Sequence, residues 1–512
     1  MLVKTYGSAV FGIEATTITI EVNISGGTKY YIVGLPDNAV KESLRRVESA
    51  LSVSGFRMPR QKIVVNLAPA DIRKEGSAYD LAIAMAILAS SNQIDARSLD
   101  EFVILGELSL DGCVQPVKGV LPIAMQAAKD GFKGILLPAA NAREAAVVMG
   151  IAVYGIRHIK EAIGFISGTH TLDPTTVDVN DVFLDKIDRY DMDFADVQGQ
   201  ENIKRALEIA AAGGHNVILI GPPGSGKTML AKRLPTILPP LSLDESLETT
   251  KIHSVAGKLA AAESLLAIRP FRSPHHTISD VALVGGGATP QPGEISLAHN
   301  GVLFLDELPE FKRAVLEVMR QPLESRQITV SRARFSVDYP ANFILVAAMN
   351  PCPCGFHNHP QKDCVCNPGM VQKYINRVSG PLLDRIDLHV EVTPVVFGEL
   401  TSKQPTEKST DIRRRVIAAR AIQARRFSTS PRIHSNAQMS PKQVREVCAI
   451  DEAGHVLLKT AMERLGLSAR AYDRILRVAR TIADMEASTP IKTEHLAEAI
   501  QFRSLDRESW RI

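Results

Sequence analysis

A glycine-rich segment between an apolar run and a helical pattern constrains the fold of this chain most. Residues 216–234 read NVILIGPPGSGKTMLAKRL, which predicts a buried strand, a tight loop and a helix. The loop fits G-x-x-x-x-G-K-[ST] with Gly221, Pro222, Pro223, Gly224, Ser225, Gly226, Lys227 and Thr228. Backbone N–H groups of such a loop, and the helix N-terminus, bind phosphate. The segment therefore predicts a nucleoside triphosphate site, with Lys227 reaching the β- and γ-phosphates and Thr228 binding Mg²⁺.

Two further apolar runs end in polar residues that suit phosphate chemistry. Residues 302–305 are followed by Asp306 and Glu307, and residues 342–349 by Asn350. Two carboxylates at the end of a buried strand are costly unless a cation lies nearby. We expect Asp306 to hold Mg²⁺, and Glu307 to orient and activate the attacking water. Asn350 would position that water or touch the γ-phosphate, although an Asn that ends a strand is often only a turn residue.

Two arginines are candidates for stabilising the charge that develops during hydrolysis. Arg385 lies between two acids in PLLDRIDLHV, and Arg470 begins a helical pattern with further arginines at 474, 477 and 480. A ring ATPase needs an arginine that reaches the γ-phosphate of a neighbouring subunit, and Arg385 is our candidate. Arg470 would sense phosphate from a helical lid. The alternatives are a structural ion pair for Arg385 and a solvated basic face for the helix of Arg470.

Composition and polar breaks divide the 512 residues into parts. The 59 Lys and Arg against 56 Asp and Glu give a net charge of +3, too small to indicate a nucleic-acid binder by itself. We expect domains at 1–168, 194–396 and 411–512, with linkers at 169–193 and 397–410. The sequence has neither an apolar stretch of about 18 residues nor a signal peptide. We therefore expect no membrane partner, a cytoplasmic location and reduced cysteines.

Basic residues gather in two places. Residues 325–340 read SRQITVSRARFSVDYP, which predicts two short strands with Arg326, Arg332 and Arg334. A basic hairpin facing a ring pore would contact DNA phosphates without reading bases; the alternative is an exposed edge that resists aggregation. Residues 411–512 carry 19 Lys and Arg against 12 Asp and Glu. This excess favours a polyanionic partner or, equally, a solvated helix face.

Four of the six cysteines form a cluster. They are spaced C-x-C-x₉-C-x-C, in a segment with neighbouring Pro and Gly, at Cys352, Cys354, Cys364 and Cys366. Four thiolates suit a closed tetrahedral Zn²⁺ site. Because such a site leaves no open position, we expect a structural role that braces the loop after Asn350. The alternatives are four reduced thiols in a loop or a redox pair.

Residues 60–140 resemble the proteolytic domain of Lon proteases. The likeness is carried by ADIRKEGSAYDLAIAMAIL and GELSLDGCVQPVKGVLPIAMQAAKDGFKGILLP. A Lon peptidase needs a Ser nucleophile and a Lys base. Without gaps those positions fall at Ala78 and Leu121, while Ser77 and Lys118 are out of register. We therefore expect an inactive peptidase fold that serves in docking, assembly or DNA contact.

The order of the motifs resembles that of AAA+ ATPases: phosphate loop, acidic strand, Asn-terminated strand, Arg385 and a helical region with Arg470. The string RPFRSPHHTISDVALVGGGATPQPGEISLAHNGVLFLDELPEF looks like the helix-2 insertion of magnesium-chelatase-type members. The whole chain is similar to the YifB/ComM family. This resemblance implies an α/β multidomain protein with a Lon-protease-like α/β N-terminal domain, an AAA+ P-loop α/β core and a C-terminal helical lid.

The resemblance also implies a function. Family members form hexameric rings with ATP at subunit interfaces, so Arg385 would be the arginine finger and Arg470 the second sensor. Members are described as DNA helicases that drive branch migration during natural transformation, which makes single-stranded or branched DNA the expected partner. The alternatives are a chelatase-type chaperone that remodels a protein or inserts a metal, a module that uses ATP only to assemble, and an ATP-dependent protease.

Overall fold

The computed structural model divides the chain into two compact units, and each is described by itself. Unit 1 comprises Met1–Ile187 and Leu243–Ala267, and unit 2 comprises Asp188–Ser242 and Ile268–Ile512. The structure describes residues 2–503 apart from 96, 180–182, 184–189, 261–262, 288–289, 333–334, 358, 360, 395–405 and 431–432. Most of the expected linker 397–410, and part of the linker 169–193, lie outside the described residues. Within the described residues, no helix is long and apolar enough to cross a membrane.

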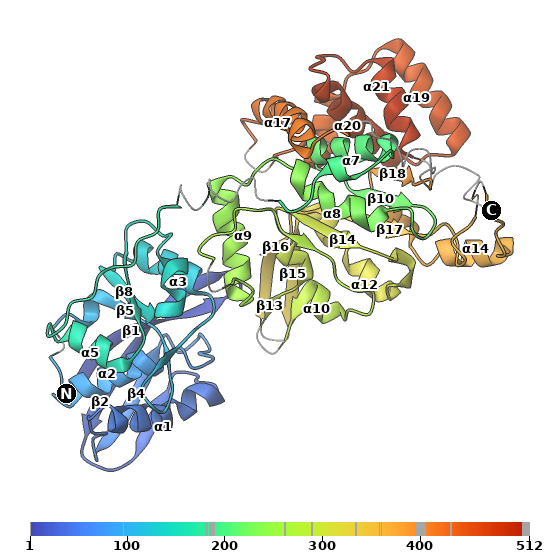
Figure 1. The fold of residues 1–512 in the computed structure, drawn as a ribbon. Helices are drawn as coiled ribbons and strands as arrows, with labels where there is room; N and C mark the ends of the chain where they lie inside the picture. Colours follow the sequence, from blue (N-terminus) through green and yellow to red (C-terminus); the bar gives the residue numbers. More distant parts are fainter. Residues whose placement is uncertain are drawn as a thin grey trace. The chain divides into compact units, whose positions relative to one another are not determined.

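Unit 1 is built on a seven-stranded mixed sheet (Figure 1). The strand order is β3-β4-β2-β1-β5-β8-β9. The strands are β1 (Leu2–Phe11), β2 (Glu14–Ser25), β3 (Tyr30–Val33), β4 (Lys62–Ala68), β5 (Phe102–Ile104), β8 (Gly134–Pro138) and β9 (Ala152–Ile156), with a separate hairpin of β6 (Glu107–Leu108) and β7 (Val114–Gln115). Burial alternates along β2 and β4, as expected for strands with one face in a core.

The helices of unit 1 follow from their sequence patterns. They are α1 (Asn38–Val53), α2 (Asp80–Ser90), α3 (Val120–Lys129), α4 (Ala142–Ala145), α5 (Ile159–Ile166) and α9 (Leu243–Val255). The side chain of Asp37 caps α1 by accepting a hydrogen bond from the Val40 N–H at 2.8 Å. Helix α2 reads DLAIAMAILAS and is buried along its whole length, because it is apolar on all sides. The mixed α/β class predicted from the sequence is confirmed.

Helix α9 belongs to unit 1, although its sequence follows the phosphate-binding segment. The Gly119 N–H donates to the carbonyl of Ser254 at 3.1 Å, and the Ser254 hydroxyl donates to Glu144. Glu144 also accepts the Leu121 N–H at 3.0 Å, and burial raises the pKa of its carboxyl. The sequence patterns did not indicate this interruption of the expected 194–396 domain.

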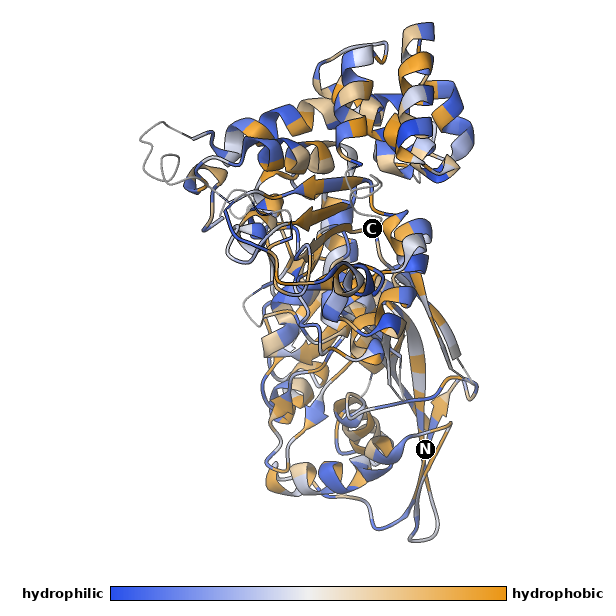
Figure 2. Cartoon of the chain, turned by 90° about the vertical axis from the view of Figure 1, so that its right-hand side faces the viewer, coloured by the Kyte–Doolittle hydropathy of each residue, from blue (hydrophilic) through white to orange (hydrophobic). Residues whose placement is uncertain are grey.

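Unit 2 is built on a five-stranded parallel sheet in the order β11-β14-β17-β10-β18. The strands are β11 (Phe271–Arg272), β14 (Val302–Leu305), β17 (Ile344–Met349), β10 (Val217–Ile220) and β18 (Leu388–Glu391). Strands β10, β14 and β17 are buried throughout and are coloured as hydrophobic in Figure 2. Such continuous apolar runs are typical of parallel strands covered on both faces.

Helices and two small hairpins complete unit 2. The helices are α7 (Glu201–Gly213), α8 (Lys227–Ile237), α10 (Asp280–Val284), α11 (Glu294–Leu297), α12 (Arg313–Val318), α13 (Arg320–Ser325), α14 (Pro368–Ile375), α15 (Gly380–Leu383), α17 (Ser409–Arg426), α18 (Pro441–Val447), α19 (Glu452–Leu465), α20 (Ala469–Met485) and α21 (Thr493–Gln501). The hairpins pair β12 (Gly285–Gly286) with β13 (Gln291–Pro292), and β15 (Gln327–Arg332) with β16 (Phe335–Pro340).

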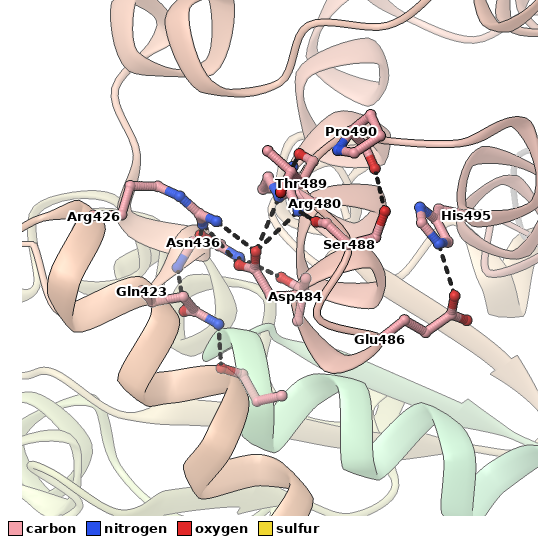
Figure 3. A network of polar contacts seen from close by, with 12 residues as sticks. Gln423, Arg426, Asn436, Arg480, Asp484, Glu486, Ser488, Thr489, Pro490 and His495 are labelled. Atoms are coloured by element: carbon pink, nitrogen blue, oxygen red, sulfur yellow. Dashed lines mark hydrogen bonds and ion pairs between the residues drawn. The ribbon is translucent and has the colours of Figure 1, made fainter.

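A buried polar network ties the C-terminal helices together (Figure 3). The carboxylate of Asp484 accepts hydrogen bonds from Arg426 at 2.7 Å, Arg480 at 3.1 Å and the amide of Asn436 at 2.8 Å. The side chain of Asp484 is fully buried, and that of Arg480 is 4% exposed. Three helical segments of the chain therefore meet on one carboxylate.

Candidate nucleotide-binding site

The glycine-rich loop joins the central strand β10 to helix α8. Gly224 and Gly226 have φ of 76° and 84°, in the left-handed region that glycine adopts without strain. A Cβ on Gly221 would lie 2.4 Å from the carbonyl oxygen of Val392, so this position also needs glycine. The carboxyl ends of parallel strands are where such folds bind ligands. The loop has the backbone that the sequence motif requires.

Lys227 places its ammonium group inside the loop. Its Nζ donates to the carbonyls of Gly221 at 2.7 Å and Pro222 at 2.8 Å, and to the Asn350 side-chain oxygen at 3.3 Å. Burial lowers the pKa of Lys227. Asn350 follows β17, the strand beside β10. The sheet therefore brings two of the predicted residues into direct contact.

The two residues that we expect to bind Mg²⁺, Thr228 and Asp306, contact each other. Thr228 lies in the first turn of α8, and Asp306 follows β14. The Thr228 hydroxyl donates to Asp306 Oδ2 at 2.7 Å. A hydroxyl and a carboxylate are oxygen ligands of the kind Mg²⁺ takes, usually alongside substrate phosphates and water. These two residues would hold the ion next to the phosphate loop.

Glu307 has an unusual backbone conformation and a partner that the sequence did not predict. Its φ is 53°, which is uncommon for a residue other than glycine and clusters at functional sites. Its carboxylate lies 3.1 Å from Nδ1 of His276 and is 57% exposed. The His276 ring packs against His275 at 4.1 Å between centroids. The signal that could have indicated His276 is the RSPHH string, which the sequence analysis used only for the resemblance.

Arg385 and Arg470 lie apart from the loop and pair with other residues. The Arg385 side chain is 7% exposed and forms an ion pair with Glu324. Arg470, at the start of α20, is 62% exposed and lies 3.6 Å from Asp384. Arg385 lies in the segment that leads into β18 and pairs outward with α13, whereas Arg470 contacts that segment from α20. Neither makes a hydrogen bond or ion pair with the phosphate loop among the described contacts.

A buried acid anchors the segment that carries Arg385. Asp387 accepts the Asn216 N–H at 3.1 Å, lies 3.3 Å from Nδ1 of His215, and pairs with Arg474 of α20. Burial acts to raise the pKa of Asp387, but Arg474 and His215 outweigh it and hold that pKa well below its usual range. The segment is therefore fixed both to the start of β10 and to the C-terminal helices.

The expected basic hairpin exists as β15 and β16, but its arginines differ in position. The Arg326 guanidinium donates to the carbonyl of Phe343 at 2.8 Å. Burial lowers the pKa of Arg326 to about 10. Arg326 is half-buried and hydrogen-bonded within its own chain, so the DNA contact that we expected for it stays a prediction. Arg332 ends β15, with its side chain not described, and Arg334 lies outside the described residues.

The four clustered cysteines come together. All four sulfur atoms lie within 4.8 Å of one another. The Sγ of Cys352 lies 3.3 Å from that of Cys354 and 3.7 Å from that of Cys364. Sulfur atoms about 2.3 Å from one Zn²⁺ in a tetrahedron would lie about 3.8 Å apart. The cluster, completed by Cys366, has the dimensions of a Cys₄ zinc site.

The Lon-like positions in unit 1 carry no nucleophile and base. Leu121 is fully buried and packs with Val147 and Leu265. The Ser77 hydroxyl donates to the carboxylate of Glu107 rather than pairing with an amine. Ala78 occupies the position expected for the nucleophile. The inactive peptidase fold stays a prediction.

Comparisons with known proteins agree with the motifs. Three family models match: "Magnesium chelatase, subunit ChlI" over residues 193–400, "Subunit ChlI of Mg-chelatase" over 20–141, and "Magnesium chelatase, subunit ChlI C-terminal" over 406–503. The protein YifB of Escherichia coli K12 is 46% identical over 98% of this chain and 96% of its own length. Competence protein ComM of Haemophilus influenzae is 43% identical, over 98% and 97%.

A third relative matches only part of the chain. Lon protease 2 of Bacillus subtilis is 30% identical over 31% of this chain and 33% of its own length. The two full-length relatives settle the family, because each is matched along nearly its whole length. This chain is a member of the YifB/ComM family of magnesium-chelatase-like AAA+ ATPases.

Proposed function

We propose that this protein hydrolyses ATP to drive a ring-shaped motor along DNA, promoting branch migration during recombination. The observation that carries the hydrolytic part is the convergence of Lys227, Thr228, Asp306 and Glu307 at the carboxyl ends of β10 and β14, the strands on either side of β17. The DNA part is supported by the similarity to a competence protein and by the basic C-terminal region. The presence of Glu307 argues against a module that uses ATP only to assemble, because such a module would not need to activate water.

The residues divide the hydrolytic step among themselves. Lys227 and the backbone N–H groups of the loop bind the β- and γ-phosphates. Thr228 and Asp306 would hold Mg²⁺, which supplies positive charge to the phosphate oxygens when bound. Glu307 orients a water and takes its proton. A bond then forms between the water oxygen and the γ-phosphorus, and the bond to the bridging oxygen breaks, which releases ADP and phosphate.

Two arginines complete the active form in this proposal. In a hexamer Arg385 would contact the γ-phosphate bound by the neighbouring subunit, with Asn350 positioning the water on its own subunit. The Arg385 guanidinium pairs with Glu324 in this structure and would pair with phosphate in the hexamer. It would therefore have an anionic partner in both states. Arg470 is exposed at the start of α20, where a helical lid would present it to the nucleotide.

A chelatase-type chaperone is the second candidate. It is favoured by the three family models named after the ChlI subunit, which match most of the chain. Such a protein would use the same ATP site to remodel a protein partner or assist metal insertion. Its hydrolysis would not respond to DNA.

The test is the ATPase rate of the full-length protein with and without single-stranded DNA, followed by migration of a four-way junction. The motor proposal expects stimulation by DNA and junction migration, both lost in Lys227→Ala. Hydrolysis that is independent of DNA, with no salt-sensitive DNA binding, would contradict the motor and favour the chaperone. Lys232→Ala, an exposed lysine on the same helix, serves as the matched control.

We also propose that the four clustered cysteines hold one structural Zn²⁺. The donor set supports it, because four thiolates at these separations fit tetrahedral sulfur coordination. The cluster begins two residues after Asn350. A bound ion would brace the loop that follows the water-positioning residue.

A further inference from the structure

Part of one face of the sheet in unit 1 is open to solvent. Helices α1 and α2 share a buried core with the opposite face, through residues such as Ile20, Val22 and Ile63. On the other face of the sheet, helix α3 covers the part around Ala15 and leaves the rest uncovered. Cross-strand pairs lie on the same face, and the registers place on the remaining part Leu2, Lys4, Glu21, Asn23, Ser25, Tyr31, Val33, Lys62, Val64 and Asn66. These side chains are exposed or half-buried.

An aromatic ring and a lysine lie together at the edge of this open face. Tyr31 is 43% exposed on β3, the edge strand. The Lys62 ammonium lies 5.6 Å from the centroid of its ring, a cation–π contact. An exposed tyrosine that is held in this way presents a flat surface at fixed orientation.

Further cations surround the same end of β3 and β4. Lys29 precedes β3, and Arg57 and Arg60 precede β4; all three are exposed. The Tyr30 hydroxyl donates to the carbonyl of Pro59 at 3.3 Å, which fixes the loop of these arginines beside β3. The acids Asp37, Asp71 and Glu75 follow the other ends of the two strands. Basic residues therefore gather at the end of the sheet where β3 and β4 begin.

The one carboxylate that the registers place on this face is already paired. Glu21 lies 3.4 Å from the Lys4 ammonium and accepts a hydrogen bond from the Asn66 amide at 2.9 Å. It therefore cancels little of the positive charge around Lys62. Three charged side chains on this face, Lys4, Glu21 and Lys62, argue against a permanent protein interface, since charged residues are depleted at the centres of such interfaces.

We propose that this open face binds single-stranded DNA. A base would stack on Tyr31, while Lys62, Lys29, Arg57 and Arg60 neutralise phosphates. Single-strand binders combine these two features, an aromatic platform and a basic track, and four-stranded sheets serve this purpose in RNA recognition. The contact is independent of base identity, because every base has a stacking face. This proposal rests on the proposed function, which identifies the nucleic acid as DNA. It adds a separate DNA contact in unit 1.

The experiment measures binding of a labelled oligothymidylate to the full-length protein by fluorescence anisotropy at several salt concentrations. We expect Tyr31→Ala to weaken binding on the order of tenfold, the effect of losing one stacked base. Tyr31→Phe keeps the ring and should bind like the parent. Lys62→Gln should weaken binding and reduce the salt slope by about one. Lys160→Gln, an exposed lysine at the start of α5, should change neither property.

The outcomes separate this proposal from the proposed function. Binding and DNA-stimulated hydrolysis that are unchanged in both Tyr31→Ala and Lys62→Gln would overturn the face as a DNA site while leaving the motor intact. A parent protein that neither binds DNA nor responds to it would overturn both. If Tyr31→Ala lowers the oligomeric mass in light scattering but leaves DNA binding unchanged, the face is a contact between copies and the proposal fails. Hydrolysis without DNA should be the same in every variant.

Discussion

The carboxylate of Glu307 is the group on which the proposed hydrolysis depends most. Glu307 lies two residues after the end of the buried strand β14. Its backbone is in the left-handed region. His276 approaches one of its oxygens at 3.1 Å. An exposed side chain gains a fixed direction from these two constraints. Preorganised groups of this kind reduce the reorganisation needed in the transition state.

His276 should act as a positioning residue for Glu307. We predict that His276→Ala lowers kcat roughly ten- to a hundredfold, because misplacing a catalytic group has effects of this size, and leaves KM for ATP unchanged. His276→Asn retains a donor near the position of Nδ1 and should recover most of the rate. Steady-state kinetics on the three proteins tests this. A rise in KM with kcat unchanged would assign His276 to nucleotide binding instead.

At this scale the sequence predicted local chemistry well and long-range partners poorly. Lys227 and Thr228 share one loop with their glycines, so a motif defines them. The contact of His276 with Glu307 joins residues about thirty positions apart in the chain, and no spacing rule reports it. Arg326 was expected to contact DNA beside a basic hairpin, but it is half-buried and its guanidinium donates to the carbonyl of Phe343.

At the scale of elements, the polar network around Asp484 holds the C-terminal helices in one arrangement (Figure 3). We predict that Asp484→Ala lowers the free energy of unfolding by about 3–5 kcal/mol, because it leaves the buried charge of Arg480 without its carboxylate partner. Denaturant unfolding measures the change. Glu446→Gln is the control, since its pair with Lys442 is exposed and 3.9 Å long, and it should cost under about 1 kcal/mol. Equal stability of the two variants would contradict a structural role for the network.

The cysteine cluster gives a second prediction at this scale. The purified protein should contain one zinc per chain, and Cys364→Ser with Cys366→Ser should remove it and lower Tm, because metal-binding free energy contributes to folding. Cys113→Ser, outside the cluster, should retain the metal. Elemental analysis and thermal unfolding test both statements. Metal-free protein with the same Tm in all variants would leave the thiols without this role.

At the scale of the whole molecule, the chain passes between the two units three times, at 187/188, 242/243 and 267/268. The α/β class and the helical C-terminal region could be predicted from periodicity, because each pattern is local. The return of α9 to unit 1 could not, since it depends on contacts such as that of Ser254 with Gly119. The expected domain boundaries remain predictions.

The most direct test of the central claim, that Glu307 activates the water that cleaves ATP, is the turnover of Glu307→Gln. Glutamine keeps the size of the side chain but cannot accept the proton. The variant should bind ATP and Mg²⁺ as the parent does, hydrolyse ATP at least about a hundredfold more slowly, and fail to migrate a four-way junction. Hydrolysis by Glu307→Gln at the rate of the parent would contradict the account.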